Sequence, residues 1–134
     1  MLRRTLLGST VVVLTLVTLL ANPAVAAGTY WGSTGAPDRV LRPGCHNYGY
    51  HYKVRPHGHD WSAETFLVDP TGEGLASGAL DPDSDPRRGR SQFRICRPST
   101  QAGRFTIRMK VSIYNGPNPR QHWVKRSYFH LRHA

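Results

Sequence analysis

The clearest pattern in the chain is a strict alternation of apolar and polar residues between positions 105 and 113. Every odd position is apolar: Phe105, Ile107, Met109, Val111 and Ile113. The even positions are polar or charged: Thr106, Arg108, Lys110 and Ser112. Because successive side chains of a β-strand point to opposite faces of its sheet, this stretch predicts a half-buried strand with one solvated face.

A second alternation lies between positions 45 and 55. One parity carries large apolar side chains: Tyr48, Tyr50, Tyr52 and Val54. Turns rich in Gly, Pro and Asn separate further predicted strands at 39–41, 61–68, 75–80, 92–97 and 122–132. In the last of these, Trp123, Phe129 and Leu131 share a parity, which predicts that all three face the core.

These seven short strands, spaced by roughly ten residues and with no helical periodicity between them, predict an all-β fold, an antiparallel β-sandwich. The predicted sandwich domain covers residues 38–134. Residues 27–37 are rich in Gly, Ser and Thr and are predicted to be a flexible N-terminal segment. Within this segment, Tyr30 and Trp31 can still pack against the domain.

The stretch from Gly103 to Val111 resembles a late strand of small secreted bacterial immunoglobulin-like domains, which starts Gly-x-aromatic-Thr. The resemblance implies an immunoglobulin-like sandwich in which Phe105 takes the place of a corner tyrosine. Phenylalanine has no hydroxyl group, so the corner hydrogen bond would be absent. The chain also departs from the antibody-type spacing, because Cys96 falls at the end of the fifth predicted strand rather than in the sixth.

The first 26 residues predict an export signal. Arg3 and Arg4 give a basic start, positions 11–21 form a largely apolar run, and Ala24-Val25-Ala26 is a small-x-small cleavage pattern. The run is too short and too close to the cleavage pattern for a membrane span. We therefore predict a secreted, extracellular protein. The paired arginines leave open whether export follows the general secretory route, which the strong apolar run favours, or the twin-arginine route.

The two cysteines, Cys45 and Cys96, predict a disulfide, because an even pair in an exported protein is usually oxidised. The bridge would close a loop of about 50 residues and stabilise the fold by about 4 kcal/mol. In an immunoglobulin-like strand order the second and fifth strands are antiparallel neighbours, which places the start of one beside the end of the other. Two free thiols or a metal pair are the alternatives.

Charge is distributed unevenly along the chain. All eight acidic residues lie between Asp38 and Asp85, whereas twelve Lys or Arg residues and no acid follow from Arg87 onward. This asymmetry indicates an anionic partner. Export argues against nucleic acid and favours a cell-envelope polymer, an acidic polysaccharide, lipid headgroups or a protein. The alternative is that the fold interleaves the two halves and evens out the charge.

The predicted partner-binding residues form a basic stripe with an aromatic side chain in it. They are Arg104, Arg108, Lys110, Arg126, Tyr128 and Arg132. Basic residues interleaved with aromatic rings hold an anionic polymer by charge and stacking. The alternative is a solvated sheet face whose charges prevent pairing between sheet edges.

Metal-binding and catalytic patterns are weaker. His57 and His59 are candidate zinc or copper ligands, but no HExxH motif accompanies them, and a polar loop is the favoured interpretation. Asp81, Asp83 and Asp85 have calcium-like spacing without the remaining ligands of a calcium loop, which favours a charged turn. No nucleophile has a recognisable base nearby in sequence. We therefore predict neither enzymatic activity nor a cofactor.

The sequence thus favours a secreted, non-catalytic binding module for an anionic envelope component, a polysaccharide or a protein. A protease inhibitor or small effector acting through an exposed loop, at 81–90 or 98–103, is one alternative. An extracytoplasmic metal-binding protein is the other.

Overall fold

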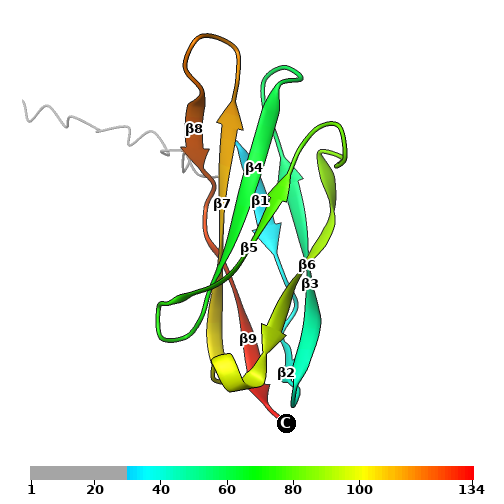
Figure 1. The fold of residues 1–134 in the computed structure, drawn as a ribbon, viewed down its shortest axis with the longest axis vertical. Coiled ribbons are helices and arrows are strands. Elements are labelled where there is room, and N and C mark those ends of the chain that lie inside the picture. The colour runs from blue at the N-terminus through cyan, green and yellow to red at the C-terminus, as the bar shows by residue number, and fades with distance from the viewer. Residues whose placement is uncertain (1–29) are drawn as a thin grey trace, which may run out of the picture.

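The computed structural model describes residues 30–134, which form two β-sheets (Figure 1). The three-stranded sheet has the order β1-β3-β6 and contains β1 (Gly32–Gly35), β3 (Cys45–Val54) and β6 (Arg88–Cys96). The six-stranded sheet has the order β2-β9-β7-β4-β5 and contains β2 (Arg39–Leu41), β4 (Trp61–Val68), β5 (Gly74–Leu80), β7 (Gly103–Ile113) and β9 (Ser127–His133), while β8 (Arg120–Trp123) pairs with one end of β7. A short 3-10 helix, η2 (Arg97–Ser99), joins β6 to β7. The all-β prediction is confirmed.

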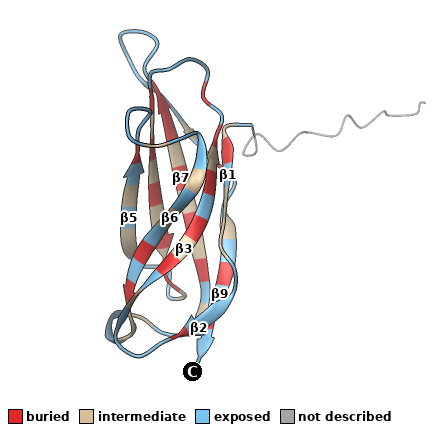
Figure 2. Ribbon diagram, turned by 90° about the vertical axis from the view of Figure 1, so that its right-hand side faces the viewer, coloured by how far each residue is buried: buried red, intermediate tan, exposed pale blue. Residues whose placement is uncertain are grey.

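The core lies between the inner faces of the two sheets (Figure 2). In β7 the predicted apolar face is confirmed, since Phe105, Ile107, Met109, Val111 and Ile113 are buried, but Ser112, expected on the solvated face, is buried as well. The alternation in β3 is also confirmed, and its inward side chains are Tyr48, Tyr50, Tyr52 and Val54. Full burial of one such apolar side chain contributes roughly 1.5–3 kcal/mol to the free energy of folding. The nine buried side chains of the two strands therefore supply a large part of the stabilisation by the core.

The hydroxyl group of each of the three inward tyrosines of β3 forms a hydrogen bond. Tyr48 donates to the Val40 carbonyl at 3.2 Å, and Tyr52 donates to the Pro86 carbonyl at 3.1 Å. The Tyr50 hydroxyl lies 2.8 Å from the hydroxyl of Thr65 on β4. Since a buried hydroxyl without a partner is costly, these bonds let β3 bury polar tips, and the Tyr50–Thr65 bond ties one sheet to the other.

The segment 27–37, which the sequence predicts to be flexible, contains strand β1 from Gly32 onward. β1 pairs antiparallel with β3, with Gly32 opposite Val54. Gly32 has φ 152°, and a Cβ added there would lie 2.2 Å from the Lys53 carbonyl oxygen. The glycine content that suggested flexibility thus permits a close approach to β3. Residues 27–29 lie outside the described residues.

The prediction of a single strand over 122–132 is wrong, because β8 and β9 are separate. Val124 lies between them, is buried, and donates its N–H to the Met109 carbonyl at 2.9 Å. This break changes the parity, so Trp123 points outward, whereas Phe129 is buried. His122 turns inward and stacks on Trp31 with ring centroids 3.8 Å apart.

The strand count also differs from prediction. β1 and the division between β8 and β9 bring the described residues to nine strands, against the seven expected. β6 begins at Arg88 rather than at Gln92, because Arg88 and Arg90 extend its pairing with β3. These two arginines therefore belong to a sheet and not to the exposed loop predicted over 81–90.

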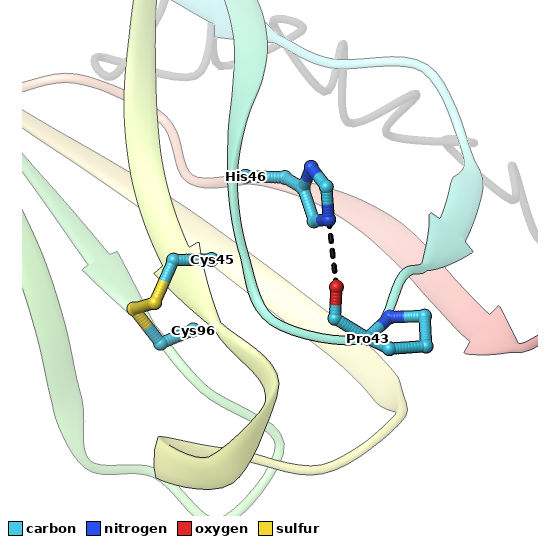
Figure 3. Close-up of a disulfide and its surroundings, with 4 residues drawn as sticks. All are labelled: Pro43, Cys45, His46 and Cys96. Carbon is cyan, nitrogen blue, oxygen red and sulfur yellow. Dashed lines mark hydrogen bonds between the residues drawn. A yellow bond between two sulfur atoms is a disulfide. The ribbon is translucent and has the colours of Figure 1, made fainter.

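The predicted disulfide is present between Cys45 and Cys96, with the sulfur atoms 2.09 Å apart (Figure 3). The two residues are register partners at the start of β3 and the end of β6. Beside the bridge, His46 Nε2 lies 2.7 Å from the Pro43 carbonyl oxygen (Figure 3). The bridge therefore closes one end of the three-stranded sheet.

The export signal predicted over residues 1–26 lies outside the described residues. Within residues 30–134, no helix has the length and apolar character that crossing a bilayer requires.

Candidate anion-binding surface

The outer face of the six-stranded sheet carries most of the predicted stripe. On β7, Arg104, Arg108 and Lys110 alternate with buried residues and therefore point away from the core. On β9, Tyr128 lies opposite Thr106 of β7, and His130 lies opposite Arg104. The pairing of β7 with β9 thus brings together, on one face, side chains that lie more than twenty positions apart in the sequence.

Aromatic rings hold the cations of this face. The Arg104 guanidinium carbon lies 4.8 Å from the centre of the Tyr128 ring, and the Arg108 guanidinium carbon lies 4.4 Å from the Trp123 ring. Trp123 and Tyr128 remain about half exposed, at 48% and 50%. A cation over an aromatic face is attracted by the ring quadrupole, so the guanidinium groups are held at the surface without an acidic partner.

Three arginines line a shallow pocket of about 410 Å³ at one end of this face. They are Arg104 and Arg108 from β7 and Arg126 from the link between β8 and β9. Thr106 and the turn that follows β4, including Asp69, complete the lining. Guanidinium groups bind carboxylate, phosphate and sulfate oxygens through paired N–H donors, so the pocket is suited to an anionic group.

Asp69 is the acidic residue of this pocket, and its carboxylate is already occupied. Its Oδ1 accepts hydrogen bonds from the Thr71 N–H at 2.8 Å and the Glu73 N–H at 3.1 Å, and its Oδ2 accepts one from the Thr100 hydroxyl at 3.1 Å. Burial by itself raises the pKa of Asp69, but hydrogen bonds from Thr71, Glu73 and Thr100 outweigh it and hold the pKa below its ordinary value. Asp69 thus serves its own turn and forms no salt bridge with the arginines of the pocket.

Two predicted residues lie apart from the pocket. Lys110 forms a salt bridge with Glu64 of β4 at 2.6 Å, so its charge is compensated. Arg132, on β9, is six positions from Arg126, about 20 Å in an extended chain, and lies in a separate hollow beside Ala102 and Gly103. The pocket itself is therefore built from Arg104, Arg108 and Arg126.

Trp123 is the residue of this face that the sequence prediction missed. Its odd parity matched Phe129 and Leu131 and placed it in the core. The signal that could have corrected this is Val124, an apolar residue at an even position beside a strand whose other core residues are odd. Phe66 of β4 also belongs to the face, with its ring centroid 6.0 Å from that of Trp123.

The residues considered for metal binding are otherwise engaged or isolated. His57 Nε2 lies 2.7 Å from the Tyr30 hydroxyl, and the His57 ring packs edge-on against Trp31. In residues 30–134, no three His, Cys, Asp or Glu side chains lie close enough together to hold a metal ion, so neither His57 nor His59 belongs to such a group.

The loops considered for an inhibitor are short. The Asp81 and Asp85 carboxylates close the turn after β5 by accepting backbone N–H groups, and η2 occupies the start of the 98–103 segment. Comparison of the chain with protein-family models, curated proteins and solved structures finds no match. The chemistry of this surface is therefore the basis for assigning a function.

Proposed function

We propose that this protein is a secreted, non-catalytic binding module that holds a linear anionic polymer on the outer face of its six-stranded sheet. The observation that carries the proposal is the convergence of Arg104, Arg108 and Arg126 on one pocket, where the nearby Asp69 carboxylate is committed to its own turn. The acidic group of the ligand supplies the ion-pair partner that the three arginines lack among residues 30–134.

The shape of the face supports a polymer rather than a small ligand. The pocket is shallow, and exposed aromatic and basic side chains continue beyond it on β8 and β9, namely Trp123, Tyr128 and Arg132. Arg108 over Trp123 and Arg104 over Tyr128 offer charge and ring surface side by side. Sugar rings pack on exposed aromatic faces while their phosphate, sulfate or carboxylate groups meet guanidinium groups, so an acidic polysaccharide or a sugar-phosphate polymer of the cell envelope suits this face.

The disulfide and the N-terminal sequence support an extracellular site of action. Disulfides persist in oxidising compartments, and Cys45 and Cys96 are joined. The first 26 residues have the composition of an export signal. An immunoglobulin-like arrangement is the corresponding proposal for the fold. It is supported by the pairing of β3 with β6 and of β4 with β7. It is also supported by the first two strands, since β1 joins the three-stranded sheet and β2 joins the six-stranded sheet.

The test is calorimetric titration of a heparin hexasaccharide, a sulfated stand-in for the acidic polymer, into the protein and into two double variants. R104Q/R108Q removes the pocket cations. R42Q/R120Q is the matched control, since it removes the same charge from two exposed arginines outside the pocket. We expect R104Q/R108Q to weaken binding about tenfold or more and the control to weaken it much less. Equal losses in both variants would overturn the proposed pocket.

The dependence of the affinity on salt concentration is a second test of the same proposal. Because exposed charges are screened at high ionic strength, the affinity should fall by about tenfold or more between about 20 mM and about 300 mM salt. An affinity unchanged by salt would contradict a charge-based binding mode.

A further inference from the structure

A second basic surface lies on the outer face of the three-stranded sheet. The outward positions of β3 and β6 face one another across the strand pair, with Lys53 opposite Arg88, His51 opposite Arg90 and Asn47 opposite Arg94. Arg88, Arg90 and Arg94 are exposed. The sequence predicts a loop at Arg88 and Arg90, but the pairing of β6 with β3 aligns three arginines along one strand.

These cations have no acidic partner. Within residues 30–134, Lys110 forms a salt bridge with Glu64 and His130 Nδ1 lies 3.8 Å from Asp38 Oδ1, and neither contact involves a cation of β3 or β6. In the same part of the chain, the aspartates of the 81–85 turn form no salt bridge with the arginines that follow them. Instead, Asp81 Oδ1 accepts the N–H groups of Asp83 and Ser84, each at 3.0 Å.

The strand pair therefore holds like charges against each other. Cross-strand pairs of like charge weaken a sheet, and Lys53 lies directly opposite Arg88. Repulsion by Arg55 and Arg88 lowers the pKa of Lys53 below its ordinary value. An anion placed over this pair removes the repulsion, so the same arrangement that weakens the free protein favours binding.

The outward side of β3 and β6, together with β2, forms a hollow that fits an anionic group. His51 and Arg90 line this pocket of about 140 Å³ with Pro37, Gly49 and Arg39, of which Arg39 comes from β2 of the six-stranded sheet. Gly49 occupies an outward position of β3, opposite Gln92. Because glycine has no side chain, nothing from this position fills the hollow. A water molecule takes about 30 Å³ in the liquid, so the pocket has room for one sulfate or phosphate group between two guanidinium groups.

We propose that this face is a second anion-binding site and that the protein bridges two polyanion chains, one on each outer face. The outer faces of two packed sheets point in opposite directions (Figures 1 and 2), so one straight chain does not reach both pockets. The bridging rests on the proposed function of the six-stranded sheet. The second site stands on its own observations: Arg39 and Arg90 in one pocket, and Lys53 opposite Arg88.

The test counts short sulfated oligosaccharides bound to each protein by native mass spectrometry, with heparin tetrasaccharide as the probe. The wild type should bind two. R88Q/R90Q, which changes two exposed side chains of β6, should bind one, R104Q/R108Q should bind one, and the control R42Q/R120Q should bind two. Matching circular dichroism spectra and cooperative thermal unfolding will show that the variants are folded.

The outcomes separate the two proposals. If R88Q/R90Q still binds two tetrasaccharides, or if the wild type binds one and R104Q/R108Q none, the second site is refuted and the first stands. If the wild type binds one and R88Q/R90Q none, the proposed site on the six-stranded sheet is refuted.

Bridging has its own readout, the turbidity of long-chain heparin mixed with protein. The wild type should give turbidity with a maximum at an intermediate ratio of protein to heparin, as bivalent binders do. R88Q/R90Q and R104Q/R108Q, the two single-face variants, each retain one binding face, so their mixtures with heparin should stay clear. Turbidity that is equal in the wild type and in both single-face variants would overturn the bridging.

Discussion

The guanidinium carbon of Arg108 lies 4.4 Å from the centre of the Trp123 indole ring, although the two side chains come from different strands. Lys110, which is the register partner of Trp123, lies with its Nζ 6.0 Å from the same ring. The indole thus holds one cation, and it meets a second whose charge Glu64 already compensates. Arg108 is positioned for a ligand by an aromatic surface rather than by a carboxylate that the ligand would have to displace.

Replacing Trp123 by Ala should weaken polyanion binding by about two- to fivefold, since a surface cation–π contact is worth about 0.5–1 kcal/mol. Trp123→Phe keeps a ring under Arg108 and should retain most of the affinity. A double-mutant cycle with Arg108→Gln, measured by calorimetry with heparin hexasaccharide, tests the coupling. Strictly additive losses would mean that Trp123 does not position Arg108.

The alternation of side chains made the strand interiors predictable. The apolar side chains of β3 and β7 recur at every second position, so the sequence alone predicted which of them are buried, although the burial of Ser112 was not predicted. The cysteines at the ends of β3 and β6 predicted the bridge. β1 was missed because its burial depends on glycine: Gly32 lies against the β3 backbone, which no apolar pattern records.

The candidate site was predictable only in part, because it depends on strand register and on a break in a strand. Arg104 and Arg108 followed from the pattern of β7, whereas Trp123 was assigned to the core until the link at Val124 changed its parity. The second basic face was missed because cross-strand pairing, such as Lys53 with Arg88, is a property of register between distant segments.

Removing the disulfide should lower stability substantially. The bridge joins residues 51 positions apart, and the chain-entropy relation gives a loss of about 4 kcal/mol for the C45A/C96A variant. Urea denaturation of the variant and the wild type, followed by tryptophan fluorescence, measures the difference. A loss below about 1 kcal/mol would mean that the unfolded chain is hardly constrained by the bridge.

Asp69 should make stability depend on acid pH. Its pKa is lower in the folded protein than in the unfolded chain, so its contribution is present above the unfolded value of about 3.9 and is lost as the pH falls through the folded value. Asp69→Asn should cost about 2 kcal/mol at neutral pH, because charge-assisted hydrogen bonds are lost. It should also flatten the fall in stability below about pH 4. Urea midpoints measured from about pH 2 to about pH 7 provide the check, and parallel curves for variant and wild type would contradict the assignment.

The like-charge pair on β3 and β6 predicts a variant that gains stability and loses binding. Arg88→Glu places a carboxylate opposite Lys53, so a repulsive cross-strand pair becomes an attractive one. The thermal midpoint should rise by about 1–4 °C, and the pKa of the Lys53 ammonium group, followed by NMR, should rise because the Arg88 charge that lowers it is gone. Arg88→Gln, which removes the repulsion without adding attraction, should fall between the variant and the wild type in both measurements. Arg88→Glu should also bind one heparin tetrasaccharide in place of two. A lower midpoint with an unchanged Lys53 pKa would show that Arg88 does not act on Lys53. Opposite signs for stability and binding are the signature of a charge arrangement maintained for a ligand at the expense of the fold.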